Sequence, residues 1–219
     1  MTVTKWFSIG NITAPSTWIA LIIAFVLSYI AIRLKFGKQT SNRFGDAIFY
    51  VIIIWKLSVI LTDFKIVINA PFALLYFNGG IIGFILGLSF VMFRTWFDWR
   101  KKRIDKDMLV ALFIGAVSVQ AVFQVMMALL NEGSLFVRVG TAVVFVGLIV
   151  FIWKNVEQSV SHIVQLSLLF MAAHVFVAAI QPKGLMNPPL LVTILIGLFF
   201  VALFVNKSTF EQTDGGKVE

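Results

Sequence analysis

Residues 108–130 read MLVALFIGAVSVQAVFQVMMALL, a run of 23 residues without a charged side chain. About 20 apolar residues in a helix are enough to cross the hydrocarbon core of a bilayer. Since that core contains no water, every backbone N–H and C=O must be paired inside the protein, which a helix achieves within one segment. The run therefore predicts a transmembrane helix.

The rest of the chain is also rich in hydrophobic residues and poor in charged ones. Of the 219 residues 60% are hydrophobic and 13% are charged, and the mean hydropathy is +0.97. We expect an all-α polytopic membrane protein with seven spans, at Trp18–Phe36, Asp46–Leu61, Pro71–Phe93, Met108–Leu130, Leu135–Trp153, Val160–Ile180 and Pro189–Val205. Pro71 and Pro188 are expected at helix entrances, where a missing N–H costs nothing. Residues 1–206 are predicted to form a single transmembrane domain, and 207–219 a flexible cytoplasmic tail.

Basic residues predict the orientation. Thirteen of the eighteen lysines and arginines fall in the tail and in the loops that share its side, while Lys5, Lys65, Arg138 and Lys183 fall on the other side. Cytoplasmic loops carry the excess of basic residues. We therefore expect the N-terminus outside and the C-terminus in the cytoplasm.

The formal net charge of +8 does not by itself indicate nucleic acid. The loop from Trp96 to Lys106 combines basic and aromatic side chains, which could stack on bases. Such loops more commonly set topology and contact anionic lipid, so no nucleic-acid partner is expected.

Several classes of chemistry are excluded or disfavoured. The chain has no cysteine, which rules out thiolate catalysis and thiolate metal sites. With two histidines and ten acidic residues, no metal and no cofactor is expected. A proton-coupled or cation-coupled carrier is disfavoured because the predicted spans contain no acidic residues suited to coupling.

Lys56 is an ionisable residue within a predicted span, in the run VIIIWKLSVIL over 51–61. Such a residue is by default a functional candidate, and a lipid phosphate would suit it. The alternative is structural: the side chain extends to the interface, or pairs with helix-end carbonyls or with Asp63.

His174 lies in the middle of the sixth predicted span. An imidazole there can serve acid–base chemistry. It can equally be a buried side chain whose hydrogen bonds are satisfied by neighbouring helices.

Glycines mark one face of the third predicted span. Gly79, Gly83 and Gly87 are spaced four residues apart, which favours close helix packing; alternatively, Asn78, Gly79 and Gly80 leave room for a lipid headgroup. In the fourth span, Gln120 and Gln124 share a face and are expected to join helices. Asn131-Glu132-Gly133 is typical of a helix end.

The order of these motifs resembles the bacterial prolipoprotein diacylglyceryl transferase family from Ile12 to Val205. LYFNGGIIG over 75–83 is similar to the family's His-Gly-Gly-Leu-Ile-Gly stretch, with Asn78 in place of the catalytic histidine. Lys56 takes the place of the arginine in the second-span motif. The positions compared with the family's remaining site residues are Trp18, Val125, Asn131, His174 and Ala178.

The resemblance implies seven spans, and transfer of diacylglyceryl from phosphatidylglycerol to a lipoprotein cysteine at the outer leaflet of the bacterial inner membrane. Asn78 cannot act as a base, Val125 carries no charge and Ala178 replaces a carboxylate. We therefore expect a catalytically degenerate protein that binds phospholipid, a lipidated partner or another membrane protein. The lipid-binding candidates are Trp18, Lys56, Asn78, Gly79, Gly80, Asn131 and His174, and the candidate catalytic residues are His174 and Asn78. The alternative is an active, divergent transferase that uses Lys56 for phosphate and His174 for protons.

Overall fold

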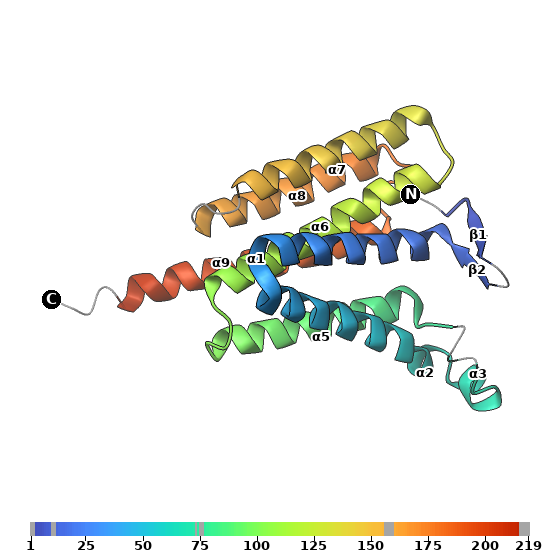
Figure 1. Ribbon diagram of the computed structural model, residues 1–219, viewed down its shortest axis with the longest axis horizontal. Coiled ribbons are helices and arrows are strands. Elements are labelled where there is room, and N and C mark those ends of the chain that lie inside the picture. The colour runs from blue at the N-terminus through green and yellow to red at the C-terminus, as the bar shows by residue number, and fades with distance from the viewer. Residues whose placement is uncertain (1–2, 10–11, 73, 75–76, 156–159, 215–219) are drawn as a thin grey trace. The chain divides into compact units, whose positions relative to one another are not determined.

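The computed structural model describes residues 3–9, 12–72, 74, 77–155 and 160–214, and nearly all of its regular structure is helical (Figure 1). A short hairpin precedes the helices. The elements are β1 (Trp6–Ile9), β2 (Ile12–Pro15), α1 (Ser16–Leu57), α2 (Val59–Thr62), α3 (Phe64–Asn69), α5 (Gly80–Arg100), α6 (Lys106–Leu130), α7 (Leu135–Asn155), α8 (Val160–Ala179) and α9 (Pro188–Asp214).

Six helical stretches of the described chain are long and apolar enough to cross a bilayer. Large apolar side chains are exposed on them: Leu34 exposes 82% of its surface, Phe136 78% and Phe176 65%. Water would penalise so much exposed apolar surface, whereas lipid does not. The prediction of a helical membrane protein is confirmed.

Two compact units make up the chain. Unit 1 contains Met1–Lys35 and Val110–Glu219, and unit 2 is the continuous segment Phe36–Leu109. Each is described by itself below. The expectation that 1–206 forms one transmembrane domain stays a prediction.

The first candidate span, Ser16–Thr62, is 47 residues long and would measure about 70 Å as a straight helix. That is more than twice the ~30 Å of a hydrocarbon core. Gly37 interrupts it with a φ of 82° and a ψ of −175°, values outside the helical region. Residues 16–36 and 38–57 are thus two helices on either side of one glycine. The prediction of a loop before Asp46 is wrong, because residues 38–45 are already helical.

The predicted all-α class is confirmed, and a short antiparallel hairpin of β1 and β2 precedes the helices, pairing Trp6 with Pro15 and Phe7 with Ala14. The predicted start of the third span needs correction. Pro71 lies in a turn, and the third long helix begins only at Gly80. The backbone explains this delay: Gly80 has a φ of 58°, which is not helical, and the N–H of Gly79 donates to the carbonyl of Trp55 at 3.1 Å.

The later boundaries are close to the expected ones. Helices α6, α7 and α8 differ from their predicted spans by at most two residues at either end. Helix α9 starts at Pro188, as expected for a proline at a helix entrance, and continues past Val205 to Asp214. The segment expected as a flexible tail thus begins as helix, and 215–219 lie outside the described residues.

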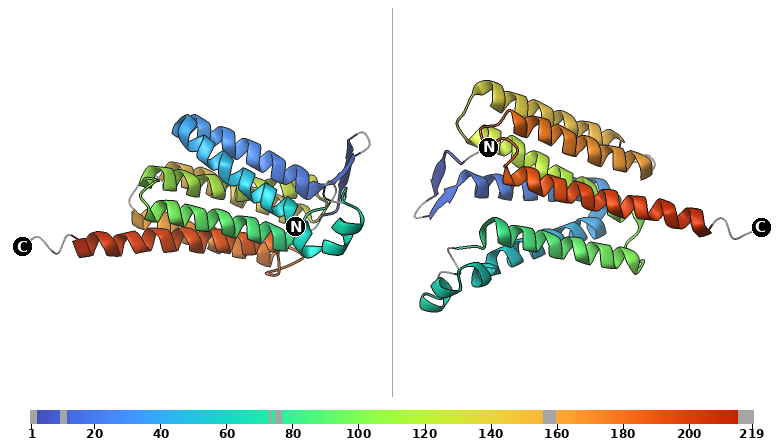
Figure 2. Two further views of the ribbon diagram at one scale, coloured as in Figure 1. Left: turned by 90° about the horizontal axis from the view of Figure 1, so that it is seen from below. Right: turned by 180° about the vertical axis from the view of Figure 1, so that it is seen from behind.

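In unit 1, α7, α8 and α9 lie alongside one another (Figures 1 and 2). Helices α8 and α9 make the closest contact: a Cβ added at Gly197 of α9 would lie 2.5 Å from the Met171 sulfur of α8. Aromatic rings fill the core, with Phe113 and Phe200 in an edge-on pair at 5.3 Å and Phe145 against Phe170 at 6.0 Å.

In unit 2, α5 packs against the helix at 38–57 through its glycine stripe (Figure 2). A Cβ at Gly83 would overlap the Ser58 hydroxyl oxygen, and one at Gly87 would lie 2.8 Å from the Val51 carbonyl oxygen. The packing interpretation of the stripe is confirmed, because these three glycine positions have no room for a side chain.

Gly87→Ala should destabilise unit 2, because the new Cβ meets the Val51 backbone, which cannot move aside as a side chain does. We expect a loss of about 1–3 kcal/mol, typical of overpacking. The measurement is thermal unfolding of the purified protein in detergent.

Gly147→Ala in α7 is the matched control, since nothing lies within 4 Å of a Cβ there. Alanine favours helix over glycine by roughly 1 kcal/mol, so this variant should unfold at the same temperature as the parent or above it. Equal destabilisation by the two substitutions would contradict the packing of α5 on 38–57.

Candidate functional site

The candidate residues are divided between the two units. Trp18, Asn131 and His174 belong to unit 1, and Lys56, Asn78, Gly79 and Gly80 belong to unit 2. Each group is therefore considered within its own unit.

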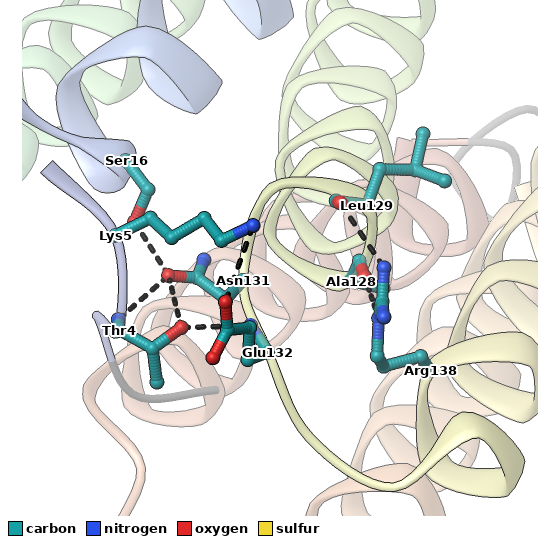
Figure 3. A network of polar contacts seen from close by, with 8 residues as sticks. All are labelled: Thr4, Lys5, Ser16, Ala128, Leu129, Asn131, Glu132 and Arg138. Carbon is teal, nitrogen blue, oxygen red and sulfur yellow. Dashed lines mark hydrogen bonds and ion pairs between the residues drawn. The ribbon is translucent and has the colours of Figure 1, made fainter. Parts of the chain in front are cut away.

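Asn131 holds the N-terminal segment against the end of α6 (Figure 3). Its side-chain oxygen accepts hydrogen bonds from the backbone N–H of Thr4 at 2.8 Å, the Thr4 hydroxyl at 3.3 Å and the Ser16 hydroxyl at 2.7 Å. Its amide nitrogen donates to the Met127 carbonyl at 3.1 Å. Asn131 is 1% exposed, so its side-chain amide is bonded to the protein rather than to solvent.

Neighbouring contacts complete this end of α6 (Figure 3). The last carbonyls of a helix lack partners within it. Arg138 supplies them, donating to the carbonyls of Ala128 at 2.8 Å and Leu129 at 3.2 Å. Lys5 and Glu132 form an exposed ion pair at 3.3 Å. The predicted helix end at 131–133 is confirmed, since α6 ends at Leu130.

Asn131→Ala should destabilise unit 1 by about 1–3 kcal/mol, because the buried Ser16 hydroxyl and the partly buried Thr4 N–H lose their acceptor. The measurement is thermal unfolding in detergent, with proteolysis of the N-terminal segment as a second readout. Glu132→Gln is the control: it removes an exposed ion pair worth at most about 1 kcal/mol. If the two variants unfold alike, Asn131 does not hold this segment.

His174 is completely buried between helices. Its Nδ1 lies 2.6 Å from the hydroxyl oxygen of Thr193 on α9, and its ring meets Phe145 of α7 edge-on at 5.1 Å between centroids. Among the described residues its Nε2 has no hydrogen-bond partner. The surroundings match the interpretation of a structural histidine that joins three helices.

Further polar contacts join the helices of unit 1. Gln120 donates to the Pro189 carbonyl at 2.6 Å, as expected for a residue joining helices. Gln124 is fully buried, but its amide has no partner within the described residues, so the same role is not shown for it. The sequence did not predict the contact of Gln181, which accepts from Asn187 at 2.8 Å; the polar pair flanking the turn at 182–186 was the available signal.

In unit 2, Asn78 shapes the start of α5. Its side-chain oxygen accepts from the Gly80 N–H at 2.9 Å, and the Trp55 indole donates to the Gly80 carbonyl at 2.8 Å. The Ser58 side chain lies where a side chain at Gly79 would be. Lys56 is half-buried in the last turn of α1, between Trp55 and Ser58 in the sequence. The structure thus brings the segment at 55–58 to 78–80, although no space for a headgroup opens at Gly79.

The remaining compared positions carry no chemistry. Trp18 is half-buried in the first turn of α1, Val125 is half-buried on α6 and Ala178 is fully buried on α8. None of the three supplies a charge or an acid–base group.

Sequence reasoning missed Asp98, whose side chain is 8% exposed near the end of α5. Arg43 donates a hydrogen bond to it, Arg103 lies 3.5 Å away and Arg94 3.9 Å away. The available signal was a lone acid amid the basic residues of the 94–106 segment. This arrangement connects the helix at 38–57, α5 and the following loop through a paired charge.

Basic and aromatic side chains surround the same end of α5. Arg100 lies 5.0 Å from the ring centroid of Trp96, and Lys101 lies 4.3 Å from that of Phe97. These four side chains are exposed. Such pairing of cations with aromatic rings is typical of the membrane interface.

The fold and these sites define a multi-pass helical membrane protein. Within the described ranges, no group of three or more His, Asp or Glu side chains is placed to hold a metal ion. Comparison of the chain with protein-family models, curated proteins and solved structures gives no significant match. The resemblance to diacylglyceryl transferases therefore stays a prediction.

Proposed function

We propose that this chain is a multi-pass protein of the bacterial inner membrane that binds phospholipid without catalysing diacylglyceryl transfer. One observation carries the proposal: the side chains of Asn131, His174 and Asn78 each make a hydrogen bond within the protein. Asn131 is saturated by the N-terminal segment, His174 is buried against Thr193, and Asn78 caps the start of α5.

Transfer chemistry needs more than these residues offer. A thiol must lose a proton to a base, and the phosphate that leaves must be stabilised by nearby donors or cations. A base must come within hydrogen-bonding distance of its substrate, and His174 exposes none of its surface. Together with the neutral Asn78, this supports binding without turnover.

Lipid binding is supported by the basic and aromatic end of α5. Exposed Arg100 and Lys101 lie over Trp96 and Phe97, and Arg94 lies 4.5 Å from the ring centroid of Tyr50. Each basic side chain near an anionic membrane surface contributes about 1 kcal/mol of attraction. The surface suits anionic headgroups such as that of phosphatidylglycerol. The same proposal makes Lys56 a lipid-binding residue. It also includes binding of a lipidated protein or of another membrane protein.

The proposed topology has seven spans, with the N-terminus outside and the C-terminus in the cytoplasm. Its support is the interruption at Gly37, which divides the 47-residue stretch into two lengths of helix that each suffice for one crossing. With five further long helices this makes seven, and an odd number places the termini on opposite sides.

Single-cysteine labelling can test the topology, because the chain has no cysteine of its own. In spheroplasts, Lys65→Cys and Lys183→Cys should react with a membrane-impermeant maleimide. Lys38→Cys and Lys102→Cys, on the predicted cytoplasmic side, should react only after permeabilisation. Labelling of Lys38→Cys and Lys65→Cys from the same side would contradict a crossing between them.

The purified protein should retain phosphatidylglycerol yet not consume it. Labelled phosphatidylglycerol and a lipoprotein signal peptide with its cysteine are incubated with the protein, and the peptide mass is recorded. An active transferase assayed in parallel is the positive control. No mass shift is expected, and a diacylglyceryl adduct formed over many turnovers would overturn the noncatalytic proposal.

The alternative is an active divergent transferase that uses Lys56 and His174. The observation in its favour is the His174 Nε2, which has no partner in the described part of the chain. If turnover were found, His174→Ala should abolish it on this alternative. Full turnover in His174→Ala would leave His174 a structural role only.

A further inference from the structure

A groove of about 430 Å³ lies in unit 1 between the first helix of α1, α6 and α7. Its walls are almost wholly apolar, and Leu27, Ala31, Val122 and Ile149 contribute to them. The volume is in the range of small-molecule sites, and an apolar wall within a membrane suits an acyl chain. All the lining residues belong to unit 1.

One end of the groove is polar and basic. Trp153 and Lys154 of α7 line it, and the Lys35 ammonium donates to the Trp153 carbonyl at 3.2 Å. The same ammonium lies 5.4 Å from the Trp153 ring centroid, and the Trp153 indole donates to Ser118 at 3.0 Å. Tryptophan and lysine together mark the headgroup level of a bilayer.

The groove wall contains a polar atom that the described chain does not bond. Ser28 is 1% exposed, lines the groove, and its hydroxyl has no hydrogen-bond partner among the described residues. A buried unpaired hydroxyl costs free energy. Ser28 and Lys35 are seven residues apart and share a face of the helix, about 10 Å apart along its axis. A ligand with an ester carbonyl below an anionic group would match this spacing.

We propose that this groove binds one acyl chain of an anionic phospholipid of the predicted cytoplasmic leaflet. The phosphate lies near Lys35 and Lys154, and the Ser28 hydroxyl donates to an ester carbonyl. The choice of an anionic lipid follows from charge complementarity, since both side chains at the polar end are cationic. This inference rests on the proposed function, to which it adds a defined site for the acyl chain and the leaflet of the lipid.

The test is native mass spectrometry of the purified full chain with phosphatidylglycerol or phosphatidylcholine of identical acyl chains. The parent should bind phosphatidylglycerol more tightly. The double variant Lys35→Gln, Lys154→Gln should weaken phosphatidylglycerol binding about thirtyfold, because two basic contacts are lost, and should leave phosphatidylcholine binding unchanged. No headgroup preference in the parent would overturn the proposal.

The matched control is Lys65→Gln, Lys183→Gln, which removes the same charge from exposed positions on the predicted opposite side of the membrane. Its phosphatidylglycerol binding should equal that of the parent. An equal loss in both double variants would mean that overall charge attracts the lipid, and would overturn a site at the groove.

Filling the groove should exclude the acyl chain whatever the headgroup. Ala31→Phe fills it from the side of α1, and Val122→Phe fills it from α6 in case the first variant does not fold. Either folded variant should lose at least tenfold in affinity for both lipids. Undiminished binding by a folded variant would overturn the groove as the site, while the proposal that the protein binds lipid would stand. If the parent protein itself retains no phospholipid, the proposed function is wrong.

Discussion

The absence of water in the hydrocarbon core is the constraint on which the whole structure depends. Polar groups there must find partners inside the protein, because an unpaired one costs several kcal/mol. The ends of the helices show how this requirement is met. Asn131 gathers donors from the N-terminal segment, and Arg138 caps the carbonyls that α6 leaves open. A side chain used in this way is not available for chemistry, so the same constraint limits function.

How far the fold could be predicted depended on whether a signal was local. Helices α6, α7 and α8 were predictable because long apolar runs end at polar residues within one or two positions. Two features were not predictable in this way. Gly37 interrupts a helix that continues through a basic segment, and the start at Gly80 depends on a hydrogen bond from Gly79 to Trp55, 24 positions earlier. Contacts of that kind arise only when two helices meet.

The candidate site shows the same division between local and distant signals. The glycine stripe was interpretable because residues four apart in a helix lie on one face. In the structure that face packs on the helix at 38–57. Asp98 was overlooked because its partner Arg43 lies 55 residues away, in a segment expected to be a loop. His174 left two interpretations open, since sequence alone could not supply Thr193 and Phe145 as neighbours.

A lipid-binding protein and a lipid-modifying enzyme need different things from the same membrane depth. An enzyme needs polar groups preorganised around the reacting atoms, at a position that the substrate can enter. A binding protein needs an apolar wall for the acyl chain and cations at the level of the phosphate, where water still offsets the cost of charge. In unit 1 the side-chain oxygen of Asn131 is already bonded, while Lys154 lines an apolar groove and Lys35 donates to Trp153 of its wall. The arrangement in unit 1 therefore follows the requirements of binding, because cations lie beside an apolar groove and the side chain of Asn131 is engaged by the protein itself.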